Sequence, residues 1–235
     1  MIKIIPFESL GNQNHGWLNA RHHFSFSSYY DPERLGYPPL IVWNDDTIKA
    51  GTGFPFHPHQ NMEIITYIRT GAITHRDNLG NKGRTLAGNI QVMSAGSGII
   101  HSEYNLEKVD TTLFQIWIET AVPNIKPRWD TKPFPANATT TFSLLASGRK
   151  ADVQNDKLQI YQDAALYAGA FNKGEKVSYN IDIDRHLYLV PSSGKLKING
   201  TDVNERDGVY IFNEEQIVVD SISDSEIVFV DLPLI

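Results

Sequence analysis

The stretch Gly53-Phe54-Pro55-Phe56-His57-Pro58-His59-Gln60-Asn61-Met62-Glu63 carries two histidines separated by one residue. A second stretch, Gly96-Ser97-Gly98-Ile99-Ile100-His101-Ser102-Glu103-Tyr104-Asn105, carries a histidine and a glutamate at the same spacing. Residues i and i+2 of a β-strand point to the same face. Each stretch therefore predicts a strand that presents two potential metal ligands on one face.

These two predicted strands can form one metal site if they lie side by side or across a barrel. Four side chains would then meet: His57, His59, His101 and Glu103. Imidazole and carboxylate ligands suit a divalent first-row metal such as Fe, Mn, Ni, Cu or Zn. A single His-x-His pair is more often a solvated strand face. The second pair, about 40 residues later and behind its own Gly-x-Gly turn, makes a metal site the better interpretation.

Composition limits the classes of protein that need considering. The 235 residues, 41% of them hydrophobic, can fill one large β domain or two smaller ones. The net charge is −6 and no segment concentrates Lys and Arg, so we expect no direct nucleic-acid binding. The chain has no cysteine, which excludes disulfides, thiolate ligands and cysteine nucleophiles.

The chain has no segment typical of membrane insertion or export. Pro6 and Glu8 interrupt a first apolar segment that is too short for a signal peptide. No run of about 18 apolar residues follows, so we expect no transmembrane helix and a cytoplasmic location.

The pattern along the chain predicts an all-β fold in two parts. Short β-rich runs recur between Gly and Asn turns, and Asn199-Gly200 is a strong hairpin signal. Prolines at 123, 127, 133 and 135 predict a linker over residues 121–137. We therefore expect an N-terminal domain at 1–125 with the metal site. A C-terminal domain at 126–235, with His186 but no His-x-His, would be a second copy of the β module without metal ligands.

The two opening stretches resemble the metal motifs of cupins. Gly51, His57, His59 and Glu63 follow the spacing of the first motif, although Gly71 comes one residue late. Gly98, His101 and Asn105 follow the second, with Gly96 in place of the usual proline. Within the cupins the sequence is similar to the pirin family. The similarity covers these stretches and also Asn14-His15-Gly16-Trp17-Leu18, His22, Phe24-Ser25-Phe26, Asp31-Pro32 and Asp231-Leu232-Pro233.

The resemblance implies a bicupin, which is two tandem jelly-roll β-barrels packed face to face with the metal in the N-terminal barrel. It places the ligands at His57, His59, His101 and Glu103, and it leaves Glu63 as a hydrogen-bonding residue that does not bind the metal. It also implies quercetin 2,3-dioxygenase activity, in which O2 cleaves a flavonol and carbon monoxide is released. Fe(II) is our first choice of cofactor, with Mn, Ni, Cu or Zn as alternatives.

The implied reaction needs a base beside the metal, and we expect Glu103 to accept the proton of the flavonol 3-hydroxyl. Phe54, Phe56, Tyr67 and Met93 are candidates for the substrate pocket, although each suits the barrel core equally well. His22 and His75 match positions of the family and are expected near the site.

Two other functions remain open from the sequence. The protein could be a regulator whose metal redox state controls binding to a transcription cofactor or a metabolic enzyme. It could also be an isomerase or a small-molecule binder that uses Zn as a Lewis acid. For any of these functions we expect a monomer, because the two halves can supply the paired barrels that single cupins obtain by dimerising. An open pocket with aromatic walls would favour the dioxygenase, and a sealed site with an exposed charged patch would favour the regulator.

Overall fold

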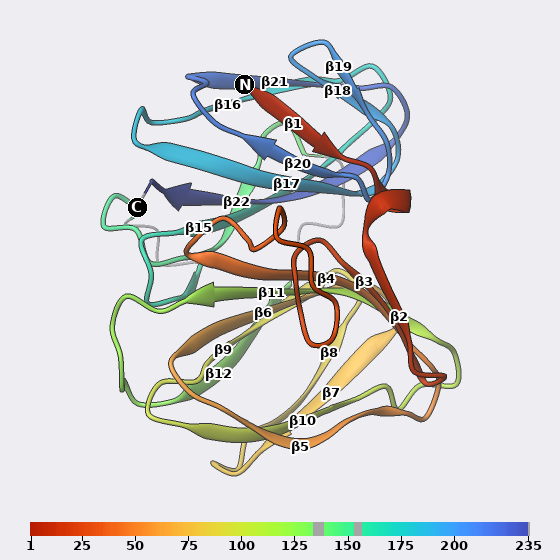
Figure 1. Ribbon diagram of the computed structural model, residues 1–235, viewed down its shortest axis with the longest axis vertical. Helices are drawn as coiled ribbons and strands as arrows, with labels where there is room; N and C mark the ends of the chain where they lie inside the picture. The colour runs from red at the N-terminus through yellow and green to blue at the C-terminus, as the bar shows by residue number, and fades with distance from the viewer. Residues whose placement is uncertain (134–138, 153–156, 235) are drawn as a thin grey trace. The chain divides into compact units, whose positions relative to one another are not determined.

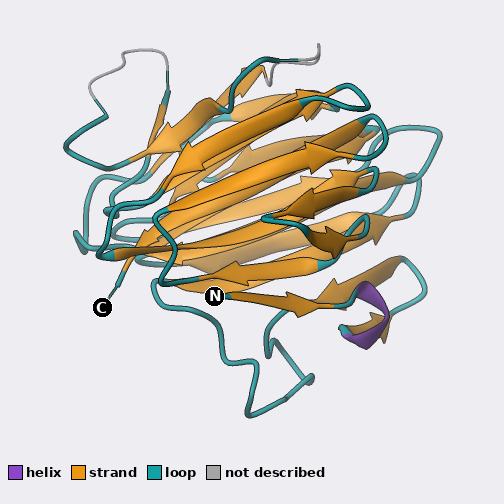
Figure 2. Cartoon of the chain, turned by 90° about the horizontal axis from the view of Figure 1, so that it is seen from above, coloured by secondary structure: helices purple, strands orange, loops and turns teal. Residues whose placement is uncertain are grey.

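The structure, a computed structural model, describes residues 1–133, 139–152 and 157–234. Within these ranges the regular elements are β-strands and one turn of 3-10 helix, η1 (Phe7–Ser9), as Figure 1 and Figure 2 show. The predicted all-β fold is therefore confirmed. In the same ranges no helix has the length and apolar character that crossing a membrane requires.

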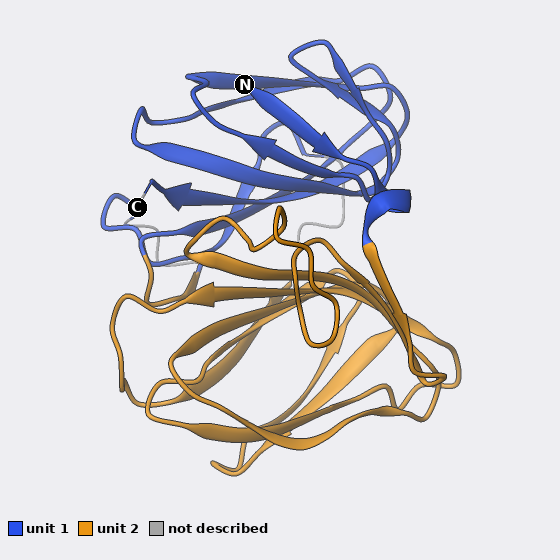
Figure 3. Cartoon of the chain, in the orientation of Figure 1, with its two compact units in different colours: residues 1–10, 134–157, 163–235 blue, residues 11–133, 158–162 orange. Residues whose placement is uncertain are grey.

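The chain divides into two compact units (Figure 3). Unit 1 comprises residues 1–10, 134–157 and 163–235, and unit 2 comprises residues 11–133 and 158–162. This division differs from the expected boundary after residue 125. The first ten residues belong to unit 1 because Ile2 pairs with Ile211 in an antiparallel ladder. A pairing between positions so far apart in the sequence leaves no local signal.

Unit 2 holds the two stretches that opened the sequence analysis. Its strands are β2 (Gly11–Asn14), β3 (Leu18–His22), β4 (Leu40–Ile48), β5 (Gly53–His59), β6 (Met62–Thr70), β7 (Ala72–Asp77), β8 (Lys82–Leu86), β9 (Asn89–Ser94), β10 (Ile99–Tyr104), β11 (Thr111–Glu119), β12 (Arg128–Pro133) and β14 (Leu158–Gln159). All of them except β14 belong to two sheets, one in the order β12-β9-β6-β11-β4-β3-β2 and the other in the order β5-β10-β7-β8. These sheets are opposite walls of unit 2 in Figure 1.

The core of unit 2 follows from alternation along these strands. Leu18, Ile48, Ile68, Ile73 and Leu113 are almost fully buried and pack together from five different strands. Alternate residues of a strand face the same side, so this apolar cluster fixes which side chains of each strand point between the sheets.

The predicted linker is partly a strand. Residues 128–133 form β12 at the edge of the larger sheet of unit 2, with Trp129 opposite Met93 on β9. Pro133 ends this strand, and an edge strand tolerates proline because one side of its backbone needs no ladder hydrogen bonds. Pro135 lies outside the described residues.

Unit 1 repeats the arrangement with shorter strands. They are β1 (Ile2–Ile5), β13 (Ser143–Ser147), β15 (Ala165–Phe171), β16 (Lys176–Asn180), β17 (Arg185–Ser193), β18 (Leu196–Ile198), β19 (Thr201–Val203), β20 (Gly208–Ile211), β21 (Gln216–Ser221) and β22 (Ser225–Pro233). One sheet contains them in the order β1-β20-β17-β22-β15-β13, and the other has the order β16-β21-β18-β19. The predicted hairpin at Asn199-Gly200 is confirmed, because both residues have positive φ (46° and 81°) between β18 and β19.

Candidate metal centre

Strands β5 and β10 lie side by side, and their register brings the histidines together. His101 is directly opposite His57, and Ile99 is opposite His59. One potential ligand atom from each of His57, His59 and His101 lies within 4.8 Å of the others. The i, i+2 spacing therefore places all three imidazoles on the inner face of the smaller sheet.

The hydrogen bonds of His57 show which of its nitrogens is free to bind a cation. Its Nδ1 lies 2.7 Å from the carbonyl oxygen of Pro55. A carbonyl only accepts, so Nδ1 carries the hydrogen and Nε2 carries a lone pair. That Nε2 is 3.1 Å from Nε2 of His101. Two nitrogens that each bind one ion at about 2.1 Å and at roughly a right angle would lie about 3 Å apart, so the residues fit a single metal ion.

Burial and mutual repulsion lower the pKa values of His59 and His101 and so favour their neutral, metal-binding form. Burial, and then repulsion from His57 and His59, lowers the pKa of His101 to about 2. Burial, and then His57, lowers the pKa of His59 to about 4. His59 and His101 are therefore neutral at physiological pH, and a neutral imidazole is the ligand form of histidine.

Glu103 follows the histidines on β10 and is held by uncharged donors. Its Oε1 accepts from Gln91 Nε2 at 2.5 Å and from Thr66 Oγ1 at 3.2 Å, while Oε2 accepts from Gln115 Nε2 at 2.6 Å. Burial raises its pKa to about 7 although these hydrogen bonds oppose the shift. Glu103 lies in the same pocket as the histidines but outside the set of atoms within 4.8 Å.

The pocket at the histidines is open to solvent and has an accessible volume of about 60 Å³. His57 and His59 are only half-buried, so solvent reaches the cluster. Three aromatic side chains and an aliphatic one form its apolar walls, and polar side chains complete it. The lining residues outside the predicted ligand set are Phe26, Asn44, Asp46, Phe54, Ile64, Gln115 and Trp117.

The candidates for the substrate pocket lie in different places. Phe54 lines it, and Met93 packs against Ile64, which also lines it. Phe56 is 59% exposed and lines a separate surface cavity, because its neighbour His57 points inward. Tyr67 is 1% exposed and stacks on Phe114 at 5.9 Å, away from the pocket lining.

The remaining residues named from the sequence surround the site without joining the imidazole cluster. Glu63 accepts a hydrogen bond from Ser94 Oγ at 2.7 Å and points opposite to its pocket-lining neighbour Ile64. Nδ1 of His22 is 2.7 Å from Oδ1 of Asn44. His75 is fully buried and its Nδ1 is 3.5 Å from Nδ1 of His101.

Sequence reasoning missed several residues that shape the site. Gln91 and Gln115 hold the Glu103 carboxyl, Trp117 meets the His59 ring edge-on at 5.0 Å, and Trp129 stacks on His75 at 4.8 Å. All four lie in strands outside the two motifs. The signal available for Gln91 and Gln115 was an amide flanked on both sides by apolar residues of its strand.

Comparison with known proteins places the chain among close relatives. Residues 6–118 match the family model described as Pirin, and residues 144–232 match the Quercetinase C-terminal cupin domain. A quercetin 2,3-dioxygenase of Escherichia coli K12 is 40% identical over 99% of both chains. A pirin-like protein of Caulobacter vibrioides is 52% identical over 98% of this chain and 99% of its own.

Solved structures of a bacterial pirin and of a quercetin 2,3-dioxygenase are also similar to this chain. The bacterial pirin YhhW of Escherichia coli in complex with nickel(II) superposes with a TM-score of 0.94 at 40% identity, covering 100% of each chain. A quercetin 2,3-dioxygenase of Acinetobacter baumannii has a TM-score of 0.77 at 17% identity over 100% of this chain and 86% of its own. At that identity the likeness concerns the fold alone.

Proposed function

This chain belongs to the pirin family, and we propose that it is a metal-dependent dioxygenase that cleaves a flavonol such as quercetin with O2 and releases carbon monoxide. The observation that carries this proposal is the meeting of three imidazoles in an open pocket with aromatic walls. Relatives that carry the name quercetin 2,3-dioxygenase support it, and they align over nearly the whole chain.

The residues fit one divalent metal. His57, His59 and His101 would hold it through nitrogen, and we propose Glu103 as the fourth ligand. We propose Fe(II) first, while Mn, Ni, Cu and Zn also suit nitrogen and oxygen ligands. When bound, such a metal supplies a Lewis acid and, for the redox-active ions, a centre for electron transfer to O2.

Glu103 is also the proposed proton acceptor for the flavonol 3-hydroxyl. Its pKa of about 7 is near the working pH, where a general base is most effective. Gln91 and Gln115 donate hydrogen bonds to the two carboxyl oxygens and fix the orientation of the group. Loss of the substrate proton makes the flavonol ring system electron-rich, and this favours its reaction with O2.

The aromatic walls suit a flat substrate. Phe54 meets Trp17 edge-on at 5.0 Å, and Phe26 meets Trp117 edge-on at 5.4 Å, so both walls are held by ring contacts. Fixed rings orient a planar ligand and displace water from the polar base of the pocket. A sealed site was the feature that favoured a regulator, and the half-buried histidines do not form one. The monomeric state, a protein partner and a cytoplasmic location stay predictions.

The test is aerobic turnover of quercetin by protein loaded separately with Fe(II), Mn(II), Ni(II), Cu(II) and Zn(II). We expect metal-dependent loss of flavonol absorbance together with carbon monoxide release. A variant with both His57→Ala and His101→Ala should show neither. Stoichiometric metal binding without turnover for any of the five metals would refute the proposed activity.

A further inference from the structure

Asp77, the last residue of β7, contacts the candidate metal centre through His75. Oδ1 of Asp77 accepts the backbone N–H groups of Leu79 at 2.9 Å and of Asn81 at 3.0 Å. Oδ2 accepts from Asn81 Nδ2 at 2.8 Å and lies 2.9 Å from Nε2 of His75. Asp77 is 8% exposed, so this buried group is satisfied by donors on every side.

These contacts determine where the hydrogens lie. An ionised carboxylate only accepts, so the hydrogen between Asp77 and His75 belongs to Nε2 of His75. His75 is fully buried, with its ring stacked on Trp129 at 4.8 Å and 9°, and burial favours the neutral ring. A neutral imidazole carries one hydrogen, so Nδ1 of His75 is an acceptor.

The same reasoning determines the tautomer of His101, a proposed metal ligand. Nδ1 of His75 faces Nδ1 of His101 at 3.5 Å, and an acceptor there requires the hydrogen on Nδ1 of His101. Nε2 of His101 then carries a lone pair, and it faces Nε2 of His57 at 3.1 Å. His57 has the same tautomer because of its bond to Pro55, so two lone pairs converge on one point.

We infer that His75 and Asp77 are positioning residues of the metal centre, which fix the tautomer of His101 so that its Nε2 binds the cation. The inference rests on the metal site of the proposed function but not on the flavonol reaction. It assigns a role to the turn at residues 77–81. Asp77 of this turn contacts His75, and His75 in turn contacts the predicted ligand His101.

Asp77→Asn tests this assignment because the orientation of the new amide is forced. The backbone N–H groups of Leu79 and Asn81 cannot turn round, whereas the Asn81 side-chain amide can, so the new amide oxygen faces the backbone groups and its NH2 group faces His75. His75 then accepts at Nε2 and donates from Nδ1, and His101 must carry its hydrogen on Nε2, where the metal would bind.

Two readouts follow. In metal-free protein, nitrogen-15 NMR of the histidines should show the His101 hydrogen on Nδ1 in the wild type and on Nε2 in Asp77→Asn. The affinity for Ni(II), measured by calorimetry on the full chain, should fall by roughly 10–100-fold in the variant, the usual effect of losing a hydrogen-bonding partner of a metal ligand.

Asp207→Asn is the control for the loss of a buried carboxylate away from the metal centre. Asp207 is 5% exposed, accepts the backbone N–H of Phe7 on Oδ1 at 2.8 Å and that of Asn204 on Oδ2 at 2.9 Å, and lies in unit 1. It should keep both the His101 tautomer and the Ni(II) affinity. If Asp77→Asn does not fold, His75→Phe keeps the stack on Trp129, removes the acceptor for His101, and should also weaken Ni(II) binding.

An unchanged His101 tautomer and unchanged Ni(II) affinity in a folded Asp77→Asn or His75→Phe protein would overturn the inference. Both readouts are independent of quercetin turnover. A protein that binds Ni(II) as described but does not cleave flavonols would therefore refute the proposed function and leave the role of His75 and Asp77 intact.

Discussion

The smaller sheets of the two units each have four strands but differ in the side chains on their inner faces. In unit 1 the inner face of β16-β21-β18-β19 carries Val177, Leu196, Ile198 and Val219, which pack into one apolar core. In unit 2 the inner face of β5-β10-β7-β8 carries His57, His59, His75 and His101. Strand alternation is the same in both, so the residue type at the inward positions decides whether a unit has a packed core or a candidate metal centre.

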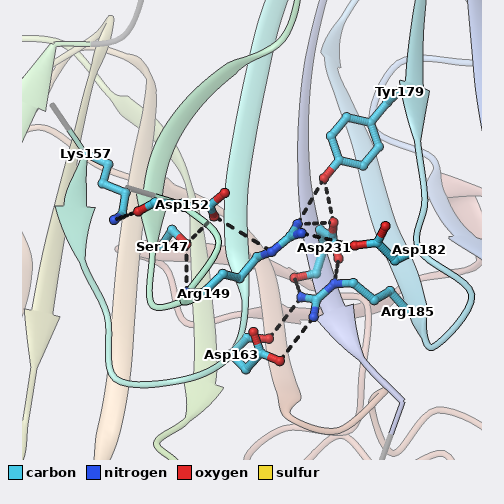
Figure 4. A network of polar contacts seen from close by, with 9 residues as sticks. All are labelled: Ser147, Arg149, Asp152, Lys157, Asp163, Tyr179, Asp182, Arg185 and Asp231. Atoms are coloured by element: carbon cyan, nitrogen blue, oxygen red, sulfur yellow. Dashed lines mark hydrogen bonds and ion pairs between the residues drawn. The ribbon is translucent and has the colours of Figure 1, made fainter. Parts of the chain in front are cut away.

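Two buried carboxylates extend the comparison. In unit 1, Asp231 is neutralised by Arg185 and by Arg149 at 2.7 Å, and Tyr179 donates to it at 2.5 Å (Figure 4). In unit 2, Glu103 receives hydrogen bonds only from the uncharged side chains of Thr66, Gln91 and Gln115. A carboxylate paired with arginines has no charge left for a cation, whereas one held by amides retains it.

The largest expected effect comes from breaking the unit 1 network. Asp231→Ala leaves Arg149 and Arg185 without their buried counter-charge, and removal of one partner of a buried ion pair costs roughly 3–5 kcal/mol. Urea unfolding should show this loss, while Ni(II) affinity stays unchanged. Asp130→Ala removes the exposed partner of Arg128 and should cost less than about 1 kcal/mol. Equal losses in the two variants would contradict a special role for the buried network.

Removing a histidine of unit 2 should affect binding rather than folding. At a Ni(II) concentration of about 100 Kd, the wild type gains about 2.7 kcal/mol in its free energy of unfolding. His101→Ala should lose nearly all of this gain, since one of the three converging imidazoles is gone. His186→Ala removes a buried histidine of unit 1 and should keep it. A full metal-induced gain in His101→Ala would remove the case for this cluster as the metal site.

The charge on Glu103 predicts a pH dependence of metal binding. Its folded pKa is about 7, so with Glu103 as the proposed fourth ligand a metal must displace a proton from the carboxyl below that pH. Affinity should therefore rise about tenfold per pH unit up to pH 7 through this group and then level off. Glu103→Gln should lose this contribution. Glu226→Gln, which removes a unit 1 carboxyl with a pKa also raised to about 7 by burial, should keep it.

The smallest effect compares two faces of one strand. Phe54 lines the pocket, whereas Phe56 lies on the opposite side of β5, because a register shift between β5 and β10 breaks the alternation between Phe54 and His57. Phe54→Ala should raise KM for quercetin by up to roughly tenfold, the value of one aromatic contact, with kcat little changed. Phe56→Ala should leave both constants as they are. A larger effect from Phe56 would place the substrate on the outer face of the sheet.

The sequence was sufficient for those features that depend on spacing along one strand. Alternation predicted strands, the Asn199-Gly200 turn predicted a hairpin, and His-x-His together with His-x-Glu predicted two pairs of inward side chains. It was insufficient where strands from distant parts of the chain meet. Gln91, Gln115 and Trp129 reach the site through pairing and register, which local spacing does not encode.

The density of prolines led us to expect a linker over residues 121–137, and part of this segment is a regular strand. Residues 128–133 form an edge strand in spite of the prolines, because such a strand needs ladder partners on one side only. The same edge supplies Trp129, which stacks on His75. Because these residues were assigned to a linker, the ring that stacks on His75 was not predicted.

The proposed reaction at the histidine cluster of unit 2 inserts both atoms of O2 into a flavonol. Mass spectrometry of the product after turnover of quercetin under isotopically labelled O2 tests this reaction. We expect both labelled atoms in the cleaved product, unlabelled carbon monoxide, and no product from the double variant His57→Ala/His101→Ala. Incorporation of a single labelled atom, or equal product from the double variant, would contradict the proposed reaction.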